Sequence, residues 1–149
     1  MEIKKGYKIV DYGCGPGRYT IPLAEMVGNQ GQVYAVDNHP LALKYVKNAA
    51  ERKNQKNIVT IYPEGVGIIL EGSIDVAVLY DTLHDIKGKA GVLKTISKLL
   101  KKGGLLSFKD HHLGAGKIEL LLLNNTSLVL GKRKKKRFLL LRSKSGFSL

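Results

Sequence analysis

Short apolar runs alternate along this chain with longer amphipathic stretches. The apolar runs are rich in β-branched and aliphatic residues and end at glycine or at polar side chains, which is typical of strands. The run at 74–80 is apolar at almost every position, as expected of a strand that is buried on both faces. The predicted strands are residues 7–12, 32–37, 57–62, 74–80 and 105–109.

Amphipathic stretches between these strands predict helices at 18–27, 40–53, 89–101 and 116–124. In the second of them Leu41, Tyr45 and Ala49 form an apolar series, and Pro40 stands at the start, where a helix tolerates proline. Two glycines at 103 and 104 are expected to end the third helix as a left-handed cap. Strands alternating with helices predict an α/β fold with a parallel sheet, in one domain over residues 1–149.

The segment 63–72 connects two predicted strands but is short and rich in glycine. A parallel connection normally needs a dozen or more residues with a helix. We therefore expect an abbreviated crossover here.

The positive charge is concentrated near the C-terminus. The whole chain has 25 Lys and Arg against 12 Asp and Glu. Two apolar runs, 127–130 and 138–141, flank the basic cluster Lys132 to Arg137, which predicts a hairpin with a charged turn. The cluster is interpreted as a solvated turn at a sheet edge, a contact with nucleic acid or another acidic partner, or a contact with an anionic membrane surface. No aromatic residue interleaves the cations, so a nucleic-acid contact would be weak and salt-sensitive.

One cysteine, Cys14, excludes an internal disulfide and favours a reducing compartment, so we expect a cytoplasmic protein. The first residues lack the apolar core of a signal peptide, and no stretch reaches the ~18 apolar residues that span a bilayer. We therefore expect neither secretion nor membrane insertion.

The segment after the first predicted strand carries the clearest chemistry. Gly13, Gly15 and Gly17 stand between a strand and a helix, where backbone N–H groups approach a ligand without interference from Cβ atoms. The dinucleotide pattern GxGxxG is absent because Arg18 occupies its third glycine position, and a P-loop would need a closing Lys and Ser or Thr. Asp37 lies twenty residues after Gly17, at the end of the second predicted strand. An acid at this position can reach the two hydroxyls of a ribose. The sequence predicts a nucleoside site.

Four segments in order, VDYGCGPG, VYAVDNHP, DVAVLYDTLHDI and LLKKGGLLSFKDHHL, resemble motifs of the class I S-adenosylmethionine-dependent methyltransferases. The resemblance is to the small methyltransferase type 11 and ubiquinone/menaquinone C-methyltransferase-like group and covers about residues 7–142, with Lys102 where proline is usual. It implies a doubly wound, Rossmann-like sheet of order 3-2-1-4-5-7-6 with strand 7 antiparallel. It also implies methyl transfer from S-adenosylmethionine to a small-molecule acceptor.

The resemblance further implies roles for individual residues. Gly13, Gly15 and Gly17, with Cys14 among them, would pack against the methionine part of the cofactor, and Asp11 would support this loop. Asp37 would bind the ribose hydroxyls, Asn38 would flank the adenine, Glu64 would stand near the adenine amine, and Tyr80 would border the cofactor. S-adenosylmethionine carries no phosphate, which agrees with a loop that needs no basic residue.

Polar residues follow both the fourth and the fifth predicted strand. Tyr80, Asp81 and His84 follow one strand, and Asp110, His111 and His112 follow the other. Neighbouring parallel strands bring such residues to the same edge of the sheet, where ligands bind. His84 or His111 is a candidate general base; capping of strand ends or exposure to solvent is the alternative. No HxH or HExxH spacing supports a metal site, so none is expected.

Three alternatives stay open. The chain could be an RNA methyltransferase or a non-catalytic nucleic-acid-binding module that uses the basic hairpin, whereas an NAD-dependent oxidoreductase conflicts with Arg18. Cys14 is the one cysteine and lies in the glycine turn, which argues against the cysteine mechanism of base C5 methylation. The Asn-Pro-Pro-Tyr type signature of amine methylation in nucleic acids is also missing, and Tyr80-Asp-Thr-Leu takes its place.

The short segment before residue 7 and the short crossover leave apolar surface near the cofactor to be covered. A homodimer is the simplest cover.

Overall fold

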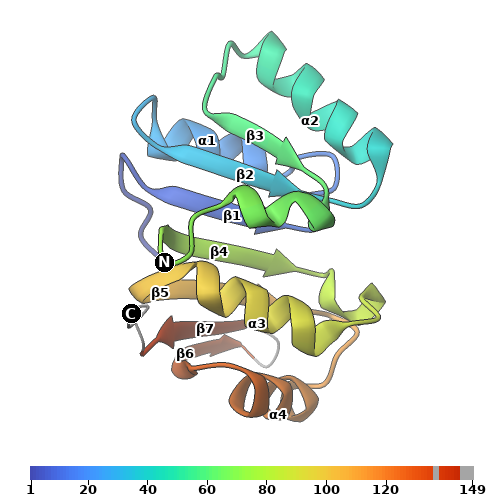
Figure 1. The fold of residues 1–149 in the computed structure, drawn as a ribbon, viewed down its shortest axis with the longest axis vertical. Coiled ribbons are helices and arrows are strands. Elements are labelled where there is room, and N and C mark those ends of the chain that lie inside the picture. The colour runs from blue at the N-terminus through green and yellow to red at the C-terminus, as the bar shows by residue number, and fades with distance from the viewer. Residues whose placement is uncertain (136–137, 145–149) are drawn as a thin grey trace. The chain divides into compact units, whose positions relative to one another are not determined.

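A computed structural model describes residues 1–135 and 138–144 of the chain (Figure 1). The chain forms two compact units, Met1–Ile69 and Leu70–Leu149. The first unit consists of β1 (Lys8–Tyr12), α1 (Thr20–Val27), β2 (Gln32–Val36), α2 (Pro40–Arg52), β3 (Ile58–Ile61) and a 3-10 helix (Pro63–Ile68).

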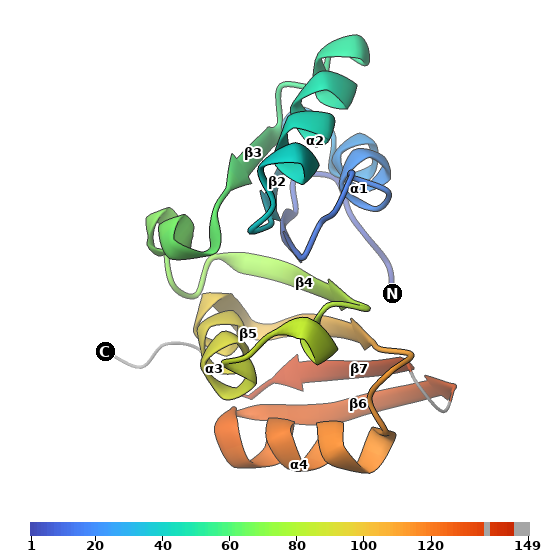
Figure 2. The same ribbon diagram turned by 90° about the vertical axis from the view of Figure 1, so that its right-hand side faces the viewer.

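The first unit is built on three parallel strands in the order β3-β2-β1. In register, Val10 lies opposite Tyr34, and Tyr34 lies opposite Val59. The strand interiors are apolar and inaccessible to solvent at Ile9, Val10, Val33 and Ala35. α1 and α2 pack against these strands and against each other (Figure 2).

Helix α2 was predicted over residues 40–53 and is observed at Pro40–Arg52. Leu41 and Tyr45 are 55% and 59% exposed, whereas Leu43, Val46 and Ala50 are buried. The chain carries two apolar series on this helix, and the series spaced at i, i+3 and i+7 faces the strands. The predicted helix is therefore confirmed, and its buried positions belong to the second series and not to the one through Leu41 and Tyr45.

The abbreviated crossover is confirmed. After β3 the chain makes only the six-residue 3-10 helix Pro63–Ile68, which begins at proline and buries Val66. No α-helix forms between β3 and β4, the first strand of the second unit.

The second unit consists of β4 (Ile74–Tyr80), a short 3-10 helix (Leu83–Asp85), α3 (Lys89–Leu99), β5 (Leu100–Lys109), α4 (Ala115–Asn125), β6 (Leu128–Lys135) and β7 (Phe138–Ser143). The strand order is β4-β5-β7-β6. β4 and β5 are parallel, and β7 is antiparallel to both β5 and β6. α3 and α4 contact each other. Leu106 and Phe108 in β5 are fully buried.

Strand β5 begins five residues earlier than predicted. Helix α3 ends at Leu99, and Leu100 already pairs with Ile74 of β4. The next pair is Val76 with Leu105, so an advance of two residues along β4 is matched by an advance of five residues along β5. Gly103, with φ of 76°, therefore lies in a bulge and does not cap a helix.

The hairpin also differs from its prediction. β6 continues to Lys135, so Lys132 to Lys135 belong to a strand and not to a turn. Arg133 lies opposite Leu139, and Lys135 lies opposite Phe138. Antiparallel pairing with the apolar run of β7 extends the strand into the basic cluster. Residues 136 and 137 of that cluster lie outside the described residues, so a nucleic-acid contact through Lys132 to Arg137 stays a prediction.

The α/β fold class is confirmed. The expected order was 3-2-1-4-5-7-6. The first unit has the order β3-β2-β1 and the second unit has the order β4-β5-β7-β6, so both parts match. The single domain and the homodimer stay predictions. Within residues 1–135 and 138–144, no helix is both long and apolar enough to cross a bilayer.

The bulge in β5 predicts opposite effects for two glycine substitutions. A Cβ atom at Gly104 would stand 2.8 Å from the Lys101 carbonyl oxygen and 3.0 Å from that of Ile74, whereas a Cβ at Gly91 in α3 meets nothing within 4 Å. We expect Gly104→Ala to lower the free energy of unfolding by about 2 kcal/mol or more because the backbone must shift. Gly91→Ala should raise it by about 0.5 to 1 kcal/mol. Urea denaturation measures both, and equal effects would contradict the bulge.

Candidate functional site

The loop after β1 folds back onto the end of β2. The amides of Gly13 and Cys14 both donate to the Val36 carbonyl oxygen, at 2.7 and 3.0 Å. Gly13, Gly15 and Gly17 have φ of 77°, 51° and 90°, the left-handed region that side chains rarely adopt. The glycine spacing in the sequence is therefore required by the path of the backbone.

Asp37 joins this loop to the start of α2. Its Oδ2 accepts a hydrogen bond from the Gly15 amide and its Oδ1 accepts one from the His39 amide, both at 2.9 Å. The side chain is partly exposed, and each carboxylate oxygen keeps capacity for another donor. This geometry suits a diol such as that of ribose, which the sequence predicted for Asp37. The neighbouring Asn38 is exposed.

Asp11 lies beneath the same loop. It is 2% exposed, and its Oδ2 accepts a hydrogen bond from the Thr20 hydroxyl at 2.7 Å. Burial raises the pKa of Asp11 to about 6, the Thr20 hydrogen bond lowers it in part, and the charge of Asp37 raises it further. Thr20 was not predicted from the sequence. A hydroxyl residue at the start of the helix that follows a glycine loop is nevertheless a recognisable signal of a polar contact to the loop.

Cys14 is a packing residue of the loop. It is buried in a cluster with Ala35, Leu43 and Val46. Burial and the charges of Asp11 and Asp37 raise the pKa of its thiol far above the ordinary value. A thiolate nucleophile is therefore disfavoured at neutral pH, as the sequence reasoning expected.

The surface of the loop is open at Gly15 and closed at Gly17. A Cβ at Gly15 would meet nothing within 4 Å, so the surface there is open, whereas a Cβ at Gly17 would press on Val46 at 3.1 Å. The polar groups around the loop are backbone amides and the carboxylates of Asp11 and Asp37. Arg18 is exposed, with its guanidinium 5.8 Å from the centre of the Tyr19 ring. Among the described residues, these two carboxylates accept hydrogen bonds from a hydroxyl and from backbone amides and none from Lys or Arg, which favours a cationic ligand over a phosphate.

Glu64 and Tyr80 are the other predicted cofactor residues. Glu64 is exposed in the 3-10 helix after β3. The pKa of Tyr12, at the end of β1, is raised mainly by the burial of Tyr12 and further by the charge of Glu64. Tyr80 ends β4 in the second unit, where its hydroxyl lies 2.6 Å from that of Ser107. Ser107 is fully buried and was not predicted.

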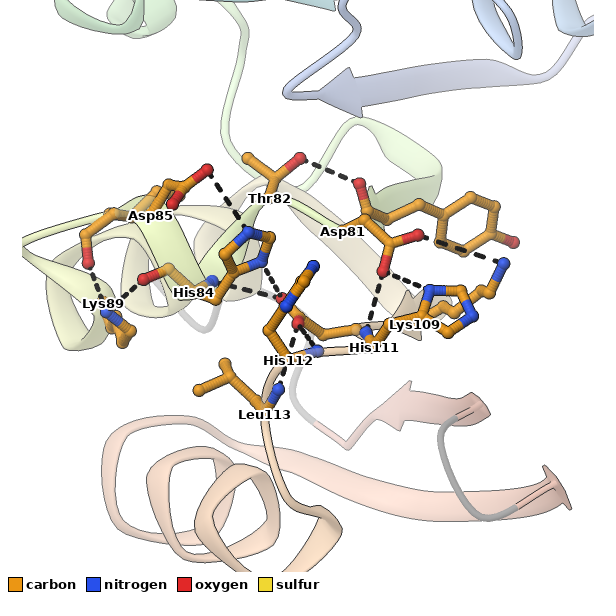
Figure 3. A network of polar contacts seen from close by, with 12 residues as sticks. Asp81, Thr82, His84, Asp85, Lys89, Lys109, His111, His112 and Leu113 are labelled. Carbon is orange, nitrogen blue, oxygen red and sulfur yellow. Dashed lines mark hydrogen bonds and ion pairs between the residues drawn. The ribbon is translucent and has the colours of Figure 1, made fainter.

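In the second unit, His111 pairs with Asp81 (Figure 3). Asp81 Oδ1 accepts hydrogen bonds from the His111 backbone at 2.8 Å and from ring atom Nδ1 at 2.7 Å. Asp81 has φ of 49°, which is rare outside glycine, and its own amide donates to the Lys109 carbonyl oxygen. Partial burial pushes the pKa of Asp81 upward, but the His111 hydrogen bonds and the charges of His111 and Lys109 hold it below its usual value.

A second pair joins His84 to Asp110. Asp110 is fully buried, and its Oδ2 lies 3.1 Å from both the backbone nitrogen and ring atom Nδ1 of His84. Its Oδ1 accepts from the amides of His112 and Leu113. Burial raises the pKa of Asp110, yet these hydrogen bonds hold it below the ordinary value. Asp110 thereby fixes the loop after β5 to the loop after β4.

The structure thus brings together the residues predicted at the ends of β4 and β5. The rings of His84 and His112 lie 4.2 Å apart at 44°. Lys89 was not predicted, and its Nζ donates to the carbonyl oxygens of His84 and Ile86. The placement of these residues at one edge is confirmed, and a catalytic role of His84 or His111 stays a prediction.

A polar hollow of about 370 Å³ lies elsewhere in the first unit. Its lining includes Gln32 at the start of β2 and Asn57 just before β3, so it lies at the amino ends of these strands. Ligands of open α/β sheets bind at the carboxyl ends. We therefore do not assign it to the candidate site.

Comparisons with known proteins find similarity to methyltransferases. A family model for a methyltransferase domain matches residues 3–139 and so spans both units. A demethylmenaquinone methyltransferase of Geobacillus stearothermophilus is 29% identical over 106 residues, which are 70% of this chain and 45% of that protein. A protein described as a probable cobalt-precorrin-6B C(15)-methyltransferase (decarboxylating) of Saccharolobus solfataricus is 39% identical over 70 residues, 46% of this chain and 35% of that protein. The chain therefore spans less than half the length of either relative.

A solved structure shares the fold. The crystal structure of a SAM-dependent methyltransferase from Aquifex aeolicus matches with a TM-score of 0.79 at 22% identity and covers 95% of this chain and 84% of that one.

The buried carboxyl of Asp11 predicts a pH dependence of stability. The folded protein holds this proton up to about pH 6, whereas the unfolded chain releases it near pH 4. The unfolded state therefore binds fewer protons in that window, and the free energy of unfolding falls as pH rises through it. We expect Asp11→Asn, measured by urea denaturation from pH 4 to 7, to flatten this decline and to add up to about 3 kcal/mol at pH 7.

The matched control is Glu25→Gln, which alters an exposed carboxylate paired with Lys53. It should change stability by less than about 0.5 kcal/mol. An Asp11→Asn protein with an unaltered pH profile would contradict the assignment.

Proposed function

Because this chain belongs to the methyltransferase-domain family, among the class I S-adenosylmethionine-dependent methyltransferases, we propose that it transfers a methyl group from S-adenosylmethionine to a small-molecule acceptor. S-adenosylmethionine is the cofactor that family membership indicates. The observation that carries the proposal is the Asp37 carboxylate, which holds the glycine loop and keeps capacity for two hydroxyl donors.

The first unit supplies the cofactor-binding residues. Asp37 accepts the ribose hydroxyls, and the backbone of Gly13 to Gly17 packs against the methionine part. Asn38 flanks the adenine, and the Glu64 carboxylate accepts a hydrogen bond from the adenine amine. Asp11 and Asp37 add negative charge beside the glycine loop, which favours a cationic ligand. Tyr80 stays a predicted cofactor residue, and within the second unit its hydroxyl lies 2.6 Å from that of Ser107.

When bound, S-adenosylmethionine supplies a methyl group on a positively charged sulfur, which makes the methyl electrophilic. The protein needs no covalent intermediate for such a transfer, which agrees with the buried Cys14 thiol. Its contribution is alignment of the acceptor with the methyl group. The candidates for handling the acceptor's proton are His84 and His111, which the second unit provides.

The names of the two relatives favour a small-molecule acceptor, because they refer to demethylmenaquinone and to a cobalt-precorrin. RNA is the second candidate, and it is favoured by the basic residues that strand β6 carries from Lys132 to Lys135. Such binding would fall steeply with salt concentration, because it would depend on contacts to phosphates.

The cofactor claim predicts binding of S-adenosylhomocysteine, measured by isothermal titration calorimetry. Asp37→Ala should weaken that binding about 10- to 100-fold, because two ribose hydroxyls lose a charged acceptor. Glu25→Ala, in the same unit, should leave the affinity unchanged. Failure of the folded wild-type protein to bind millimolar S-adenosylhomocysteine, or competition by NAD, would overturn the proposal.

A further inference from the structure

The second unit contains two Asp–His pairs. They differ in whether the second ring nitrogen of the histidine, Nε2, faces another carboxylate. In the pair Asp81–His111, the carboxylate accepts both the backbone N–H and the ring Nδ1 of His111. Asp81 is held ionised by these contacts and by Lys109, whose Nζ lies 4.0 Å from Oδ2. An ionised acceptor requires a proton on Nδ1, so the neutral ring carries its lone pair on Nε2.

The free nitrogen of His111 is accessible. The His111 side chain is 48% exposed, and among the described residues no partner contacts its Nε2. The backbone holds the pair in place: Asp81 adopts φ of 49° and donates its amide to Lys109 at 2.7 Å. Such a conformation costs about 1 kcal/mol or more and persists only where the surroundings determine it.

The pair Asp110–His84 has the opposite character. His84 is 21% exposed, with Nδ1 3.1 Å from Asp110 Oδ2 and Nε2 3.3 Å from Asp85 Oδ2. Both ring nitrogens therefore face carboxylates. Asp110 is fully buried, and it also accepts three backbone amides, from His84, His112 and Leu113. This pair holds two loops together, and His84 Nε2 faces the Asp85 carboxylate.

We propose that His111 Nε2 is the proton-accepting atom of the methyl transfer, that Asp81 is its positioning residue, and that His84 is structural. This inference rests on the proposed function and specifies its acceptor class. The acceptor is a molecule whose nucleophilic atom carries a proton, such as a hydroxyl or an acidic carbon, and not a thioether or a tertiary amine.

The step balances without a further reactant. The bond between the acceptor atom and its hydrogen breaks, and the proton passes to His111 Nε2. The electron pair left on the acceptor atom forms the new bond to the methyl carbon. The carbon–sulfur bond breaks with its electrons kept by sulfur, which gives S-adenosylhomocysteine, and the protonated ring later releases its proton to water.

The first experiment determines the ring tautomers by two-bond ¹H–¹⁵N NMR of the full chain at a pH where the rings are neutral. His111 should carry its proton on Nδ1. His39 is the internal control, because its Nδ1 accepts the Leu41 amide at 3.3 Å and its proton must therefore lie on Nε2. A His111 ring protonated on Nε2 would overturn the proposal, and this result needs no variant.

The second experiment uses diethyl pyrocarbonate, which acylates an unprotonated imidazole nitrogen, with modified residues located by mass spectrometry. His111 should react at least tenfold faster than His84. Asp81→Asn should slow the reaction at His111 severalfold and leave its rate at His84 unchanged, whereas His84→Gln should leave His111 unchanged. Faster reaction at His84, or no response of His111 to Asp81→Asn, would contradict the assignment.

Binding of S-adenosylhomocysteine separates the two proposals. Wild type, Asp81→Asn and His111→Gln should all bind it with similar affinity, because neither residue belongs to the cofactor site. Loss of binding in wild type would refute the proposed function, whereas intact binding with the wrong tautomer would refute only the role of His111.

Discussion

The hydrogen bond from the Gly15 amide to the Asp37 carboxylate is the interaction on which the proposed cofactor site depends. It fixes a loop that needs three left-handed glycines, and the same carboxylate also accepts the His39 amide just before α2. A charged acceptor strengthens both hydrogen bonds. The loop, the end of β2 and the start of α2 are thereby held at one place, with carboxylate capacity left for a ligand. Cys14 and Val46 fill the space below with apolar contacts.

The same principle recurs in the second unit, where carboxylates at strand ends collect backbone amides. Asp110 is fully buried and is compensated by hydrogen bonds on both oxygens, which is what a buried charge requires. Asp81 is more exposed and binds one histidine through both its backbone and its ring. Burial therefore separates the roles of two similar pairs. The deeper pair stabilises loops, and the shallower one leaves a reactive nitrogen accessible.

Much of this organisation could be predicted from the sequence, because strand and helix patterns, glycine spacing and the positions of Asp37, His84 and His111 are local signals. Four features could not. The early start of β5 depends on the pairing of Leu100 with Ile74, and the long β6 depends on pairing with β7, so both arise from contacts distant in sequence. The buried face of α2 depends on which of two apolar series meets the strands. Likewise, the partners of each histidine require side-chain geometry, so the sequence alone left His84 and His111 equivalent.

The central claim is that the Asp37 carboxylate and the glycine loop bind the nucleoside of S-adenosylmethionine. A crystal structure of the protein with S-adenosylhomocysteine tests it most directly. We expect both ribose hydroxyls within hydrogen-bonding distance of the Asp37 carboxylate, with the loop at Gly13 to Gly17 keeping its backbone path. A nucleoside bound away from Asp37, for example in the polar hollow beside Gln32 and Asn57, would contradict it.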